Sequence, residues 1–159
     1  LITLLKRCGE LEIHRSVDTS GYAETPIMLE VAAHTDLFLF DLKHMDDGLH
    51  KKHTGVGNEQ ILHNLKMLSK NGVSLRIRFP LLASINDSVA HVEAMGRFLS
   101  GLGSIKHVDL LVYHDLAGAK YKKLKRPDLT DRAYSVTPEI VDRTRRLLEA
   151  HGLTVHLEK

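Results

Sequence analysis

The sequence predicts a parallel α/β fold, and three observations lead to this prediction. Stretches typical of β-strands alternate with stretches typical of helices along the 159 residues. Capping residues and glycines fall where the expected helices begin and end, so local and global signals agree. Four expected strands in a row carry charged or polar residues near their carboxyl ends. Because the carboxyl ends of parallel strands open on one face, these residues are expected to converge on one crevice.

The expected elements follow one another in a regular order. An apolar helical segment covers residues 1–7 and stops at Gly9. Strands are expected at residues 12–17, 37–42, 73–79, 107–113 and 153–157. Helices are expected at residues 25–33, 58–70, 88–102 and 138–151. The second and the last of these helices carry apolar residues along one side, so they are expected to pack that side inward.

Residues at the helix boundaries support these limits. Asn58 is expected to cap the helix that starts there, and Gly72 follows the last turn of the same helix. Asn86 lies just before the next helix. Thr137 is expected to cap the last helix, whose first position is Pro138.

Composition and charge limit the classes of function. With 43% hydrophobic and 26% charged residues and no linker or repeat, residues 1–159 are expected to form one globular domain. The net charge of +2 gives no strong field for nucleic acid or a membrane surface. No apolar run approaches the roughly 18 residues of a membrane span, and no signal peptide is recognisable. The sequence therefore predicts a cytoplasmic protein with no nucleic-acid or membrane partner.

Cysteine and histidine content limits the metal sites. Cys8 is the single cysteine, which excludes an internal disulfide and a cysteine-built metal cluster within this chain. His50 and His53 have the H-x-x-H spacing that can place two imidazoles on one helical face. Two lysines lie between them and no acidic third ligand is evident, so a solvated helix turn is the favoured interpretation.

The first two strand ends offer carboxylates and a lysine. Asp18 and Thr19 follow the first expected strand, where turn chemistry explains them as well as a binding site does. Asp41 and Lys43 flank Leu42 at the end of a strand expected to be buried on both faces. Charged groups there need a partner or a ligand, because their desolvation is costly. An ion pair is one interpretation, and a Schiff-base lysine, as in barrel aldolases, is another.

The next two strands add a guanidinium and an imidazole. Arg78 lies in the strand at residues 73–79 and offers a fork for a carboxylate or a phosphate. His114 follows the strand at residues 107–113 and can donate or accept near neutral pH. Each residue taken alone fits a structural role better. Their placement at successive strand ends favours an anionic or zwitterionic small ligand.

The connection after His114 is long. Residues 114–137 lack periodicity, and loops longer than roughly 12 to 15 residues are commonly functional or disordered. Basic residues surround Tyr121 in this segment, a composition that also fits single-stranded nucleic acid. A solvated loop is the favoured interpretation.

A series of short motifs runs through the chain in a fixed order. Its members are V-D-T-S-G-Y at 17–22, D-L-F-L-F-D-L-K-H-M-D at 36–46, His50, T-G-V at 54–56, Asn58, I-L at 61–62, N-L at 64–65, I-R at 77–78, Pro80, N-D at 86–87, Y-H at 113–114, Gly118 and K-Y at 120–121. This series resembles the glycyl-radical enzyme activating enzymes, typified by pyruvate formate-lyase activating enzyme. The resemblance covers essentially the whole chain, and the ordered series carries it rather than any single motif.

The resemblance implies a radical S-adenosylmethionine enzyme built on a parallel (β/α)6 partial TIM-type barrel. Family members use a four-iron four-sulfur cluster, whose unique iron is chelated by the amine and carboxylate of S-adenosylmethionine. Reductive cleavage of this cofactor gives methionine and a 5′-deoxyadenosyl radical, which abstracts hydrogen from a glycine of a partner glycyl-radical enzyme. A flavodoxin or ferredoxin is the implied electron donor, and the implied class is the oxidoreductases that activate formate C-acetyltransferase and related enzymes.

Carried over to this sequence, the resemblance implies residues that contact S-adenosylmethionine. These are Asp41, Leu42, Lys43, Arg78 and His114. Asp18 and Thr19 would lie beside them and share a monovalent cation with Asp41. Carboxylates, a lysine and an arginine suit a zwitterionic ligand that also bears a sulfonium.

The chain departs from the family pattern in two ways. The C-x-x-x-C-x-x-C motif that binds the cluster and the following G-G-E-P segment are absent, and Cys8 cannot replace the three cysteines. The chain is therefore expected to be the C-terminal part of the barrel without the first two strand-helix units, with no catalytic residue and no activity of its own. Ala83 and Ser84 stand where the family usually has Pro-Gly, and Val112 where Pro is common, so local loop shape is affected.

Two expectations concern partners. The first strand is expected to expose an apolar edge through which the fragment self-associates. The loop after His114 is a candidate surface for the glycyl-radical partner. Two other functions remain open from the sequence: a Schiff-base aldolase that uses Lys43, and a non-enzymatic binding module.

Overall fold

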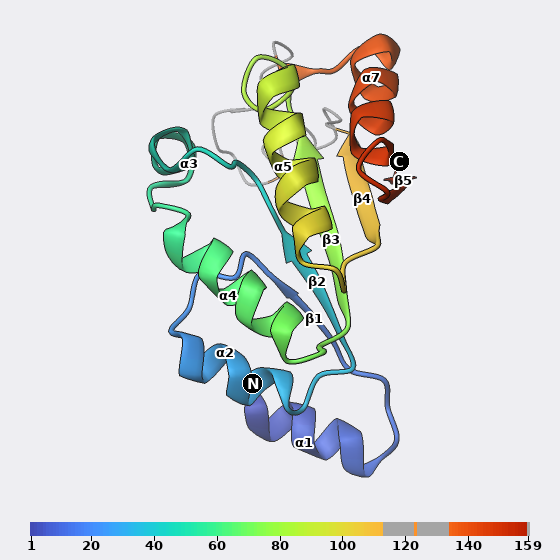
Figure 1. Ribbon diagram of the computed structural model, residues 1–159. Helices are drawn as coiled ribbons and strands as arrows, with labels where there is room; N and C mark the ends of the chain where they lie inside the picture. The colour runs from blue at the N-terminus through green and yellow to red at the C-terminus, as the bar shows by residue number, and fades with distance from the viewer. Residues whose placement is uncertain (113–122, 124–133, 159) are drawn as a thin grey trace.

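The five strands form one all-parallel sheet, as the sequence predicts. The computed structural model describes residues 1–112, 123 and 134–158 (Figure 1). The strands lie in the order β1-β2-β3-β4-β5, and every neighbouring pair is parallel. Their bounds are β1 Ser16–Thr19, β2 Leu37–Asp41, β3 Leu75–Leu81, β4 His107–Val112 and β5 Thr154–Glu158. The described helices are α1 Ile2–Glu10, α2 Thr25–Ala32, α3 Asp47–Thr54, α4 Glu59–Lys70, α5 Val89–Gly101 and α7 Pro138–Glu149.

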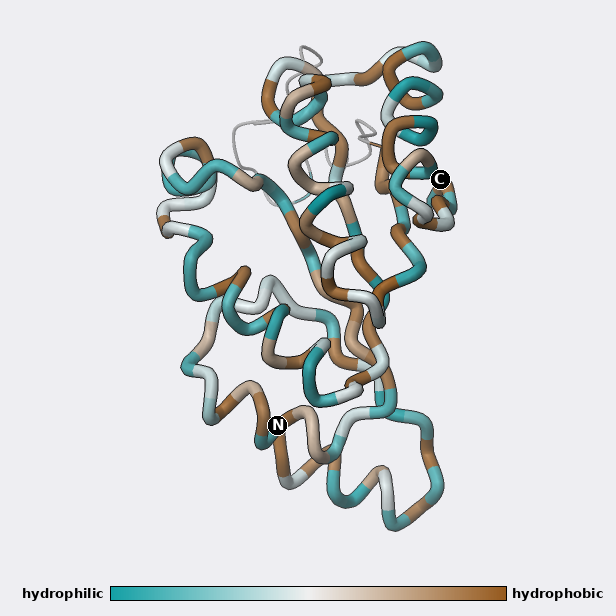
Figure 2. Tube along the Cα trace, viewed as in Figure 1, coloured by the Kyte–Doolittle hydropathy of each residue, from teal (hydrophilic) through white to brown (hydrophobic). Residues whose placement is uncertain are grey.

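The hydrophobic core lies between the sheet and the helices α2, α4, α5 and α7, which cover the same face (Figure 1). Alternate residues of the central strands point into this core and are fully buried, such as Phe38, Phe40, Ile77 and Phe79. The residues between them are only partly buried, in the pattern expected when successive side chains point to opposite faces. Hydrophobic stretches accordingly run along the central strands and along one side of the helices (Figure 2).

Three expected helix boundaries are confirmed, and one side-chain role is wrong. The hydroxyl of Thr137 accepts from the backbone N–H of Ile140 at the start of α7, and Gly72 after α4 has φ +70°. Asn58 holds the N-cap position of α4, but its side chain makes no capping hydrogen bond. Its amide donates instead to the carbonyl oxygens of two residues that follow β2.

Two strands, β1 and β3, differ from the sequence prediction by two or more residues at each end. β1 begins at Ser16 rather than at residue 12, because its pairing with β2 starts at Ser16 opposite Leu37 and extends to Thr19. Asp18 and Thr19 therefore lie within the strand, not after it. β3 runs on to Leu81, so Arg78 lies in the middle of the strand. Helix α3 was not predicted as a separate element, because its sequence D-G-L-H-K-K-H-T has little apolar periodicity.

The expectation of an apolar edge at β1 is wrong. β1 is an outer strand of the sheet, but its sequence is Ser-Val-Asp-Thr, and Val17, its single apolar residue, is partly buried. Exposed apolar side chains lie nearby instead, on α1 at Leu4 and in the following connection at Leu11 and Ile13. Self-association of the chain stays a prediction.

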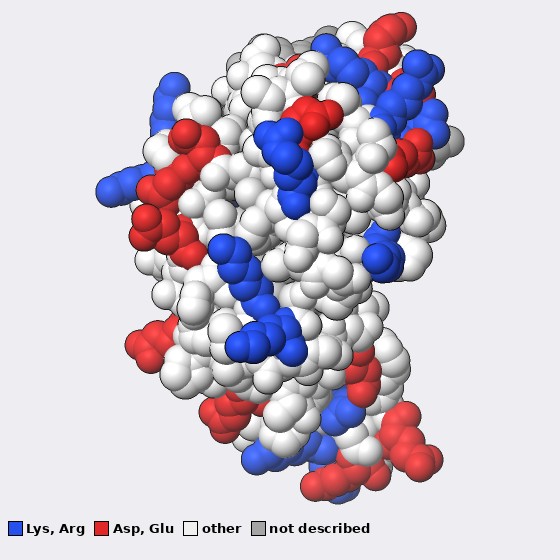
Figure 3. All heavy atoms as spheres, viewed as in Figure 1, with Lys and Arg blue, Asp and Glu red and all other residues white. Residues whose placement is uncertain are grey.

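Charges of both signs are spread over the helix-covered face. Figure 3 shows lysine and arginine interspersed with aspartate and glutamate across this view, which agrees with the small net charge. Within the described part of the chain, no helix has the length and apolarity needed to cross a bilayer.

Candidate functional site

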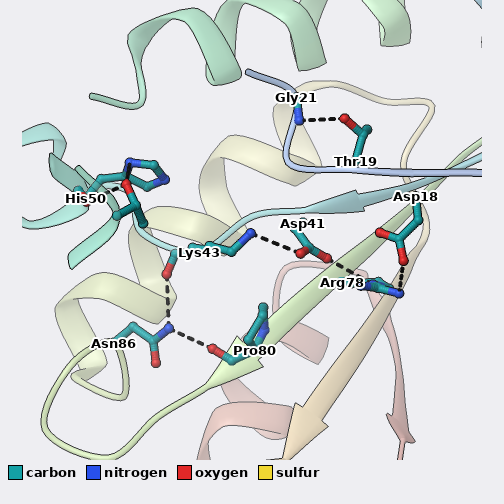
Figure 4. A network of polar contacts seen from close by, with 10 residues as sticks. Asp18, Thr19, Gly21, Asp41, Lys43, His50, Arg78, Pro80 and Asn86 are labelled. Atoms are coloured by element: carbon teal, nitrogen blue, oxygen red, sulfur yellow. Dashed lines mark hydrogen bonds and ion pairs between the residues drawn. The ribbon is translucent and has the colours of Figure 1, made fainter. Parts of the chain in front are cut away.

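Four charged side chains form a continuous chain at the carboxyl-terminal half of the sheet (Figure 4). The guanidinium of Arg78 donates from Nη1 to Asp18 Oδ2 at 2.7 Å and from Nε to Asp41 Oδ1 at 2.9 Å. The second oxygen of Asp41 accepts from Lys43 Nζ at 3.0 Å. The order is thus Asp18, Arg78, Asp41, Lys43, with alternating charge. We call this set the charge chain.

The sheet register explains why these residues meet. Asp41 of β2 is paired in register with Arg78 of β3, and Asp18 of β1 is opposite Leu39 of β2. All three charged side chains therefore lie on the face of the sheet opposite the hydrophobic core. Lys43 follows two residues after Asp41, so its side chain returns to the same carboxylate.

The middle of the charge chain is shielded and its ends are open. The side chains of Asp41 and Arg78 are 16% and 22% exposed, whereas those of Lys43 and Asp18 are 35% and 55% exposed. Burial opposes the charge of Arg78, but the hydrogen bond and charge of Asp41, helped by Asp18, outweigh it and raise the pKa of Arg78. The guanidinium therefore stays charged, and a ligand can approach the two ends.

Two of the predicted site residues, Leu42 and Thr19, have structural contacts rather than a place in the charge chain. Leu42 is 1% exposed and points into the core, while its backbone N–H donates to the carbonyl of Arg78 at 3.0 Å. The hydroxyl of Thr19 accepts from the backbone N–H of Gly21 at 3.0 Å, in a turn that follows β1. Gly21 has φ +75° and lies against the ring of Phe40, so a side chain at Gly21 would clash with that ring.

The structure brings Asp18, Asp41, Lys43 and Arg78 together, but not the hydroxyl of Thr19, which lies apart from the charge chain (Figure 4). His114 lies outside the described residues, together with Tyr121 and most of the basic segment around it. Among the residues that the structure describes, no group of three or more His, Cys, Asp or Glu side chains is placed to hold a metal ion.

A cavity of about 340 Å³ adjoins the charge chain at Lys43. It is lined by Lys43, His44, His50, His53, Thr54, Pro80, Leu82, Ile85, Asn86 and Tyr134. The interpretation of His50 as part of a solvated turn is wrong, because this residue is 4% exposed. Its Nδ1–H donates to the carbonyl of Val56 at 2.7 Å, so His50 connects the last turn of α3 to the segment that follows this helix.

His44, one of the residues that line this cavity, packs against the imidazole of His91. The ring centroids of His44 and His91 are 4.3 Å apart with the rings tilted by 36°, and the ring centroid of Phe79 lies 5.8 Å from that of His91. Burial, together with the nearby His44, lowers the pKa of His91 to about 4. Burial also lowers the pKa of His44. Sequence reasoning missed His91, because a histidine on a helix carries no signal of its depth in the core.

Several proteins of known function are similar to this chain in sequence. No protein-family model matches it. The choline trimethylamine-lyase activating enzyme of Oleidesulfovibrio alaskensis is 38% identical over 126 residues, which are 77% of this chain and 41% of that protein. The trans-4-hydroxy-L-proline dehydratase activating enzyme of Clostridioides difficile is 36% identical over 97% of this chain and 51% of that protein.

A solved structure decides the family. A domain of pyruvate-formate lyase-activating enzyme from Bacteroides vulgatus matches with a TM-score of 0.83 and 30% identity, over 100% of this chain and 89% of that domain. The chain belongs to the family of glycyl-radical enzyme activating enzymes, in the radical S-adenosylmethionine superfamily. It spans about half the length of the curated relatives it matches. Its five parallel strands are part of a TIM-type barrel.

The two cofactors of the superfamily fit this chain differently. The charge chain offers cations for a carboxylate and carboxylates for an ammonium or a sulfonium, so its donor set fits S-adenosylmethionine. A four-iron four-sulfur cluster needs several thiolates, and the sequence has one cysteine. Cys8 lies on α1, a helix near the amino ends of the strands (Figure 1). The residues of this chain therefore do not fit the cluster.

Proposed function

We propose that the charge chain binds the amino-acid part of S-adenosylmethionine, in a protein that generates a glycyl radical on a partner enzyme. The observation that carries the proposal is the convergence of Asp18, Arg78, Asp41 and Lys43 from three neighbouring strands in a chain of this family. Arg78 and Lys43 would attract the carboxylate of the ligand, while Asp18 and Asp41 would attract its ammonium and sulfonium. His114 is proposed as a further contact.

The shielded middle and open ends of the charge chain suit such a ligand. Arg78 is held by two carboxylates from two different strands, so its position is fixed before a ligand arrives. Asp18 and Lys43 are exposed enough to exchange their present partners for a ligand at little cost, because exposed ion pairs contribute little. A monovalent cation near Asp18, Thr19 and Asp41 stays a prediction, and it would compete with the guanidinium for the same oxygens.

The partner is proposed to be a glycyl-radical enzyme such as pyruvate formate-lyase, with a flavodoxin or ferredoxin as the electron donor in the cytoplasm. In family members the bound cofactor supplies the hydrogen-abstracting radical. The residues of this chain orient and shield the ligand, and none of them is assigned a chemical step. With one cysteine, the chain by itself is proposed to form no 5′-deoxyadenosine from S-adenosylmethionine and dithionite.

The aldolase alternative has less support. Lys43 Nζ lies 3.0 Å from a carboxylate oxygen of Asp41. In this pair Nζ is hydrogen-bonded to a carboxylate, whereas a Schiff-base lysine must direct its nitrogen at the carbonyl carbon of a substrate. Borohydride trapping of a carbonyl substrate on Lys43 would support the aldolase instead.

Isothermal titration of the 159-residue chain with S-adenosylmethionine tests the proposal. Binding is expected, and 5′-methylthioadenosine, which lacks the amino-acid group and the sulfonium, is expected to bind at least tenfold more weakly. Arg78→Met and Lys43→Met are expected to abolish this preference. Arg97→Met, which removes an exposed arginine on α5, is the matched control and is expected to bind normally. Equal affinity of the chain for both ligands would contradict the proposal.

A further inference from the structure

Three buried asparagines lie next to the candidate site. Asn58, Asn64 and Asn86 are 2%, 0% and 2% exposed. In each of them the side-chain amide donates both of its N–H groups to backbone carbonyl oxygens. Asn64 donates to Gly21 and Ala23, both at 2.8 Å, Asn58 to His44 and Met45, both at 2.9 Å, and Asn86 to Lys43 at 3.0 Å and Pro80 at 2.8 Å.

The six carbonyl groups lie in the segments that carry or follow the charge chain. Asn64 holds the turn after β1, just beyond Asp18. Asn58 holds the two residues after Lys43. Asn86 joins the carbonyl of Lys43 to that of Pro80, two residues beyond Arg78 on β3, so it links the ends of β2 and β3 (Figure 4).

The amide group suits these positions better than the related side chains. Two of the three asparagines also use the amide oxygen: Asn86 Oδ1 accepts from the backbone N–H of Leu82 at 2.8 Å, and Asn64 Oδ1 accepts from the hydroxyl of Thr25 at 2.7 Å. An aspartate would keep the acceptor but would place its negative oxygen against two carbonyl oxygens. A serine would keep one donor.

We propose that Asn58, Asn64 and Asn86 are positioning residues, which hold the strand-end segments so that the charge chain is set before a ligand binds. The identity of that ligand rests on the proposed function. Charged groups bind a ligand well only when supporting hydrogen bonds fix their placement, and here the support comes from the amides of side chains that are at most 2% exposed. Among the three, Asn86 acts most directly, because it bonds the backbone of Lys43 itself.

The test compares Asn86→Asp and Asn86→Ser with Asn71→Asp. Asn71 is the matched control, because its exposed amide donates to the carbonyl of Met67 at the end of α4, away from the charge chain. Each variant is first melted to find a temperature at which it is folded. At that temperature, titration with S-adenosylmethionine gives the affinity, and NMR gives the shift of the Arg78 Nε–H proton that is hydrogen-bonded to Asp41.

A loss of affinity of about tenfold or more is expected for Asn86→Asp, a smaller loss for Asn86→Ser and none for Asn71→Asp. The Arg78 Nε–H shift should move in the same order, which a general loss of stability in a folded variant would not cause. If Asn86→Asp does not fold, Asn86→Ser carries the same test.

The outcomes separate this proposal from the proposed function. Unchanged affinity and an unchanged Arg78 shift in folded Asn86→Asp would overturn the positioning role and leave the ligand assignment intact. If the unmodified chain does not bind S-adenosylmethionine, the ligand assignment fails. The Arg78 shift alone then decides the positioning role: a change in Asn86→Asp but not in Asn71→Asp supports it, and no change overturns it.

Discussion

Arg76 and Arg78 lie two residues apart on β3 and on the same face of the sheet, yet they are paired in different ways. Arg76 donates from both Nε and Nη2 to a single carboxylate, that of Asp109 on β4, which is 1% exposed. Arg78 donates from Nε to Asp41 and from Nη1 to Asp18, which come from two other strands. The guanidinium of Arg76 is thus paired with one carboxylate, whereas that of Arg78 is shared by two.

The difference distinguishes a structural ion pair from a candidate binding site. A carboxylate as deeply buried as Asp109 depends on its single guanidinium partner, so that pair has no contact to release to a ligand. Asp41 has a second partner in Lys43, and Asp18 is half exposed, so both tolerate a change of partner. We therefore expect Arg76 to matter for stability and Arg78 to matter for binding.

The largest expected effect comes from removing the two guanidinium groups separately. Arg76→Met leaves the buried carboxylate of Asp109 without its partner and should cost about 3–5 kcal/mol of unfolding free energy. Arg78→Met should cost less than about 1 kcal/mol, because Asp41 keeps Lys43 and Asp18 is solvated. Urea denaturation monitored by circular dichroism measures both. Similar losses in the two variants would remove the distinction.

A double variant provides the control. Arg76→Met combined with Asp109→Leu replaces the pair with apolar side chains of related size and should recover most of the lost stability. If the double variant is as unstable as Arg76→Met, packing of the arginine stem rather than its charge explains the loss.

The next largest effect is a fall in the unfolding free energy at mildly acidic pH. Its source shows whether the ion pairs of the two arginines stay intact there. His91 should contribute most to the pH dependence of stability, because its pKa is about 4 in the folded chain against about 6.5 when unfolded. Between these values the unfolded chain binds more protons, so the unfolding free energy falls as pH decreases from about 6.5 to about 4. The total loss is about 3 kcal/mol, and above pH 6.5 this contribution is fully present.

Denaturant titrations from pH 7 to pH 4 check this expectation. His91→Phe keeps a ring beside Phe79 and should remove most of the pH-dependent step, leaving a smaller part from His44, whose pKa is also lowered by burial. His63→Gln, at an exposed position of α4, should keep the full step. A step of undiminished size in the double variant His44→Phe with His91→Phe would show that the ion pairs titrate instead, and the comparison of the two arginines would then hold only near neutral pH.

The sequence predicts the elements that have clear hydrophobic periodicity and misses the polar ones. The parallel sheet is predictable because apolar strands such as residues 37–42 and amphipathic helices have clear periodicity. The limits of β1 and the existence of α3 are not predictable, because both segments are polar and their structure is determined by strand pairing and burial. The prediction that the Asn58 side chain caps α4 is wrong for a related reason. From the sequence alone, an asparagine that caps a helix cannot be distinguished from one whose buried amide donates to backbone carbonyls.

The candidate site is predictable as a set of residues but not as a pattern of pairs. Asp41, Lys43 and Arg78 could be proposed from their places at strand ends. Nothing in the sequence distinguishes Arg76 from Arg78, because both lie in the same strand with the same period. Their partners are decided by the register between strands, which places Asp41 and Asp109 on either side of β3.

A smaller effect tests the fork of Arg78. Arg78→Lys keeps the positive charge but cannot donate to Asp18 and Asp41 from a rigid planar group. The affinity for S-adenosylmethionine should fall about tenfold, equivalent to about 1.4 kcal/mol, while the midpoint of urea unfolding changes little. Isothermal titration measures the affinity, and Arg97→Lys is the matched control on an exposed face. Full affinity in Arg78→Lys would mean that charge alone suffices.

The smallest expected effect concerns the loop that follows the strand of both arginines. Ser84 has φ 63°, a left-handed conformation that suits glycine, and its backbone N–H donates to Asp87 at 2.8 Å. Ser84→Gly relieves about 1–2 kcal/mol of backbone strain and increases the entropy of the unfolded chain by about 0.4–1 kcal/mol. A net gain of about 0.5–1 kcal/mol is expected in urea unfolding. Ser84→Val should destabilise, since a β-branched residue is poorly tolerated at positive φ. If Ser84→Gly also changed the affinity for S-adenosylmethionine, the loop would belong to the binding site rather than to the framework that Arg76 supports.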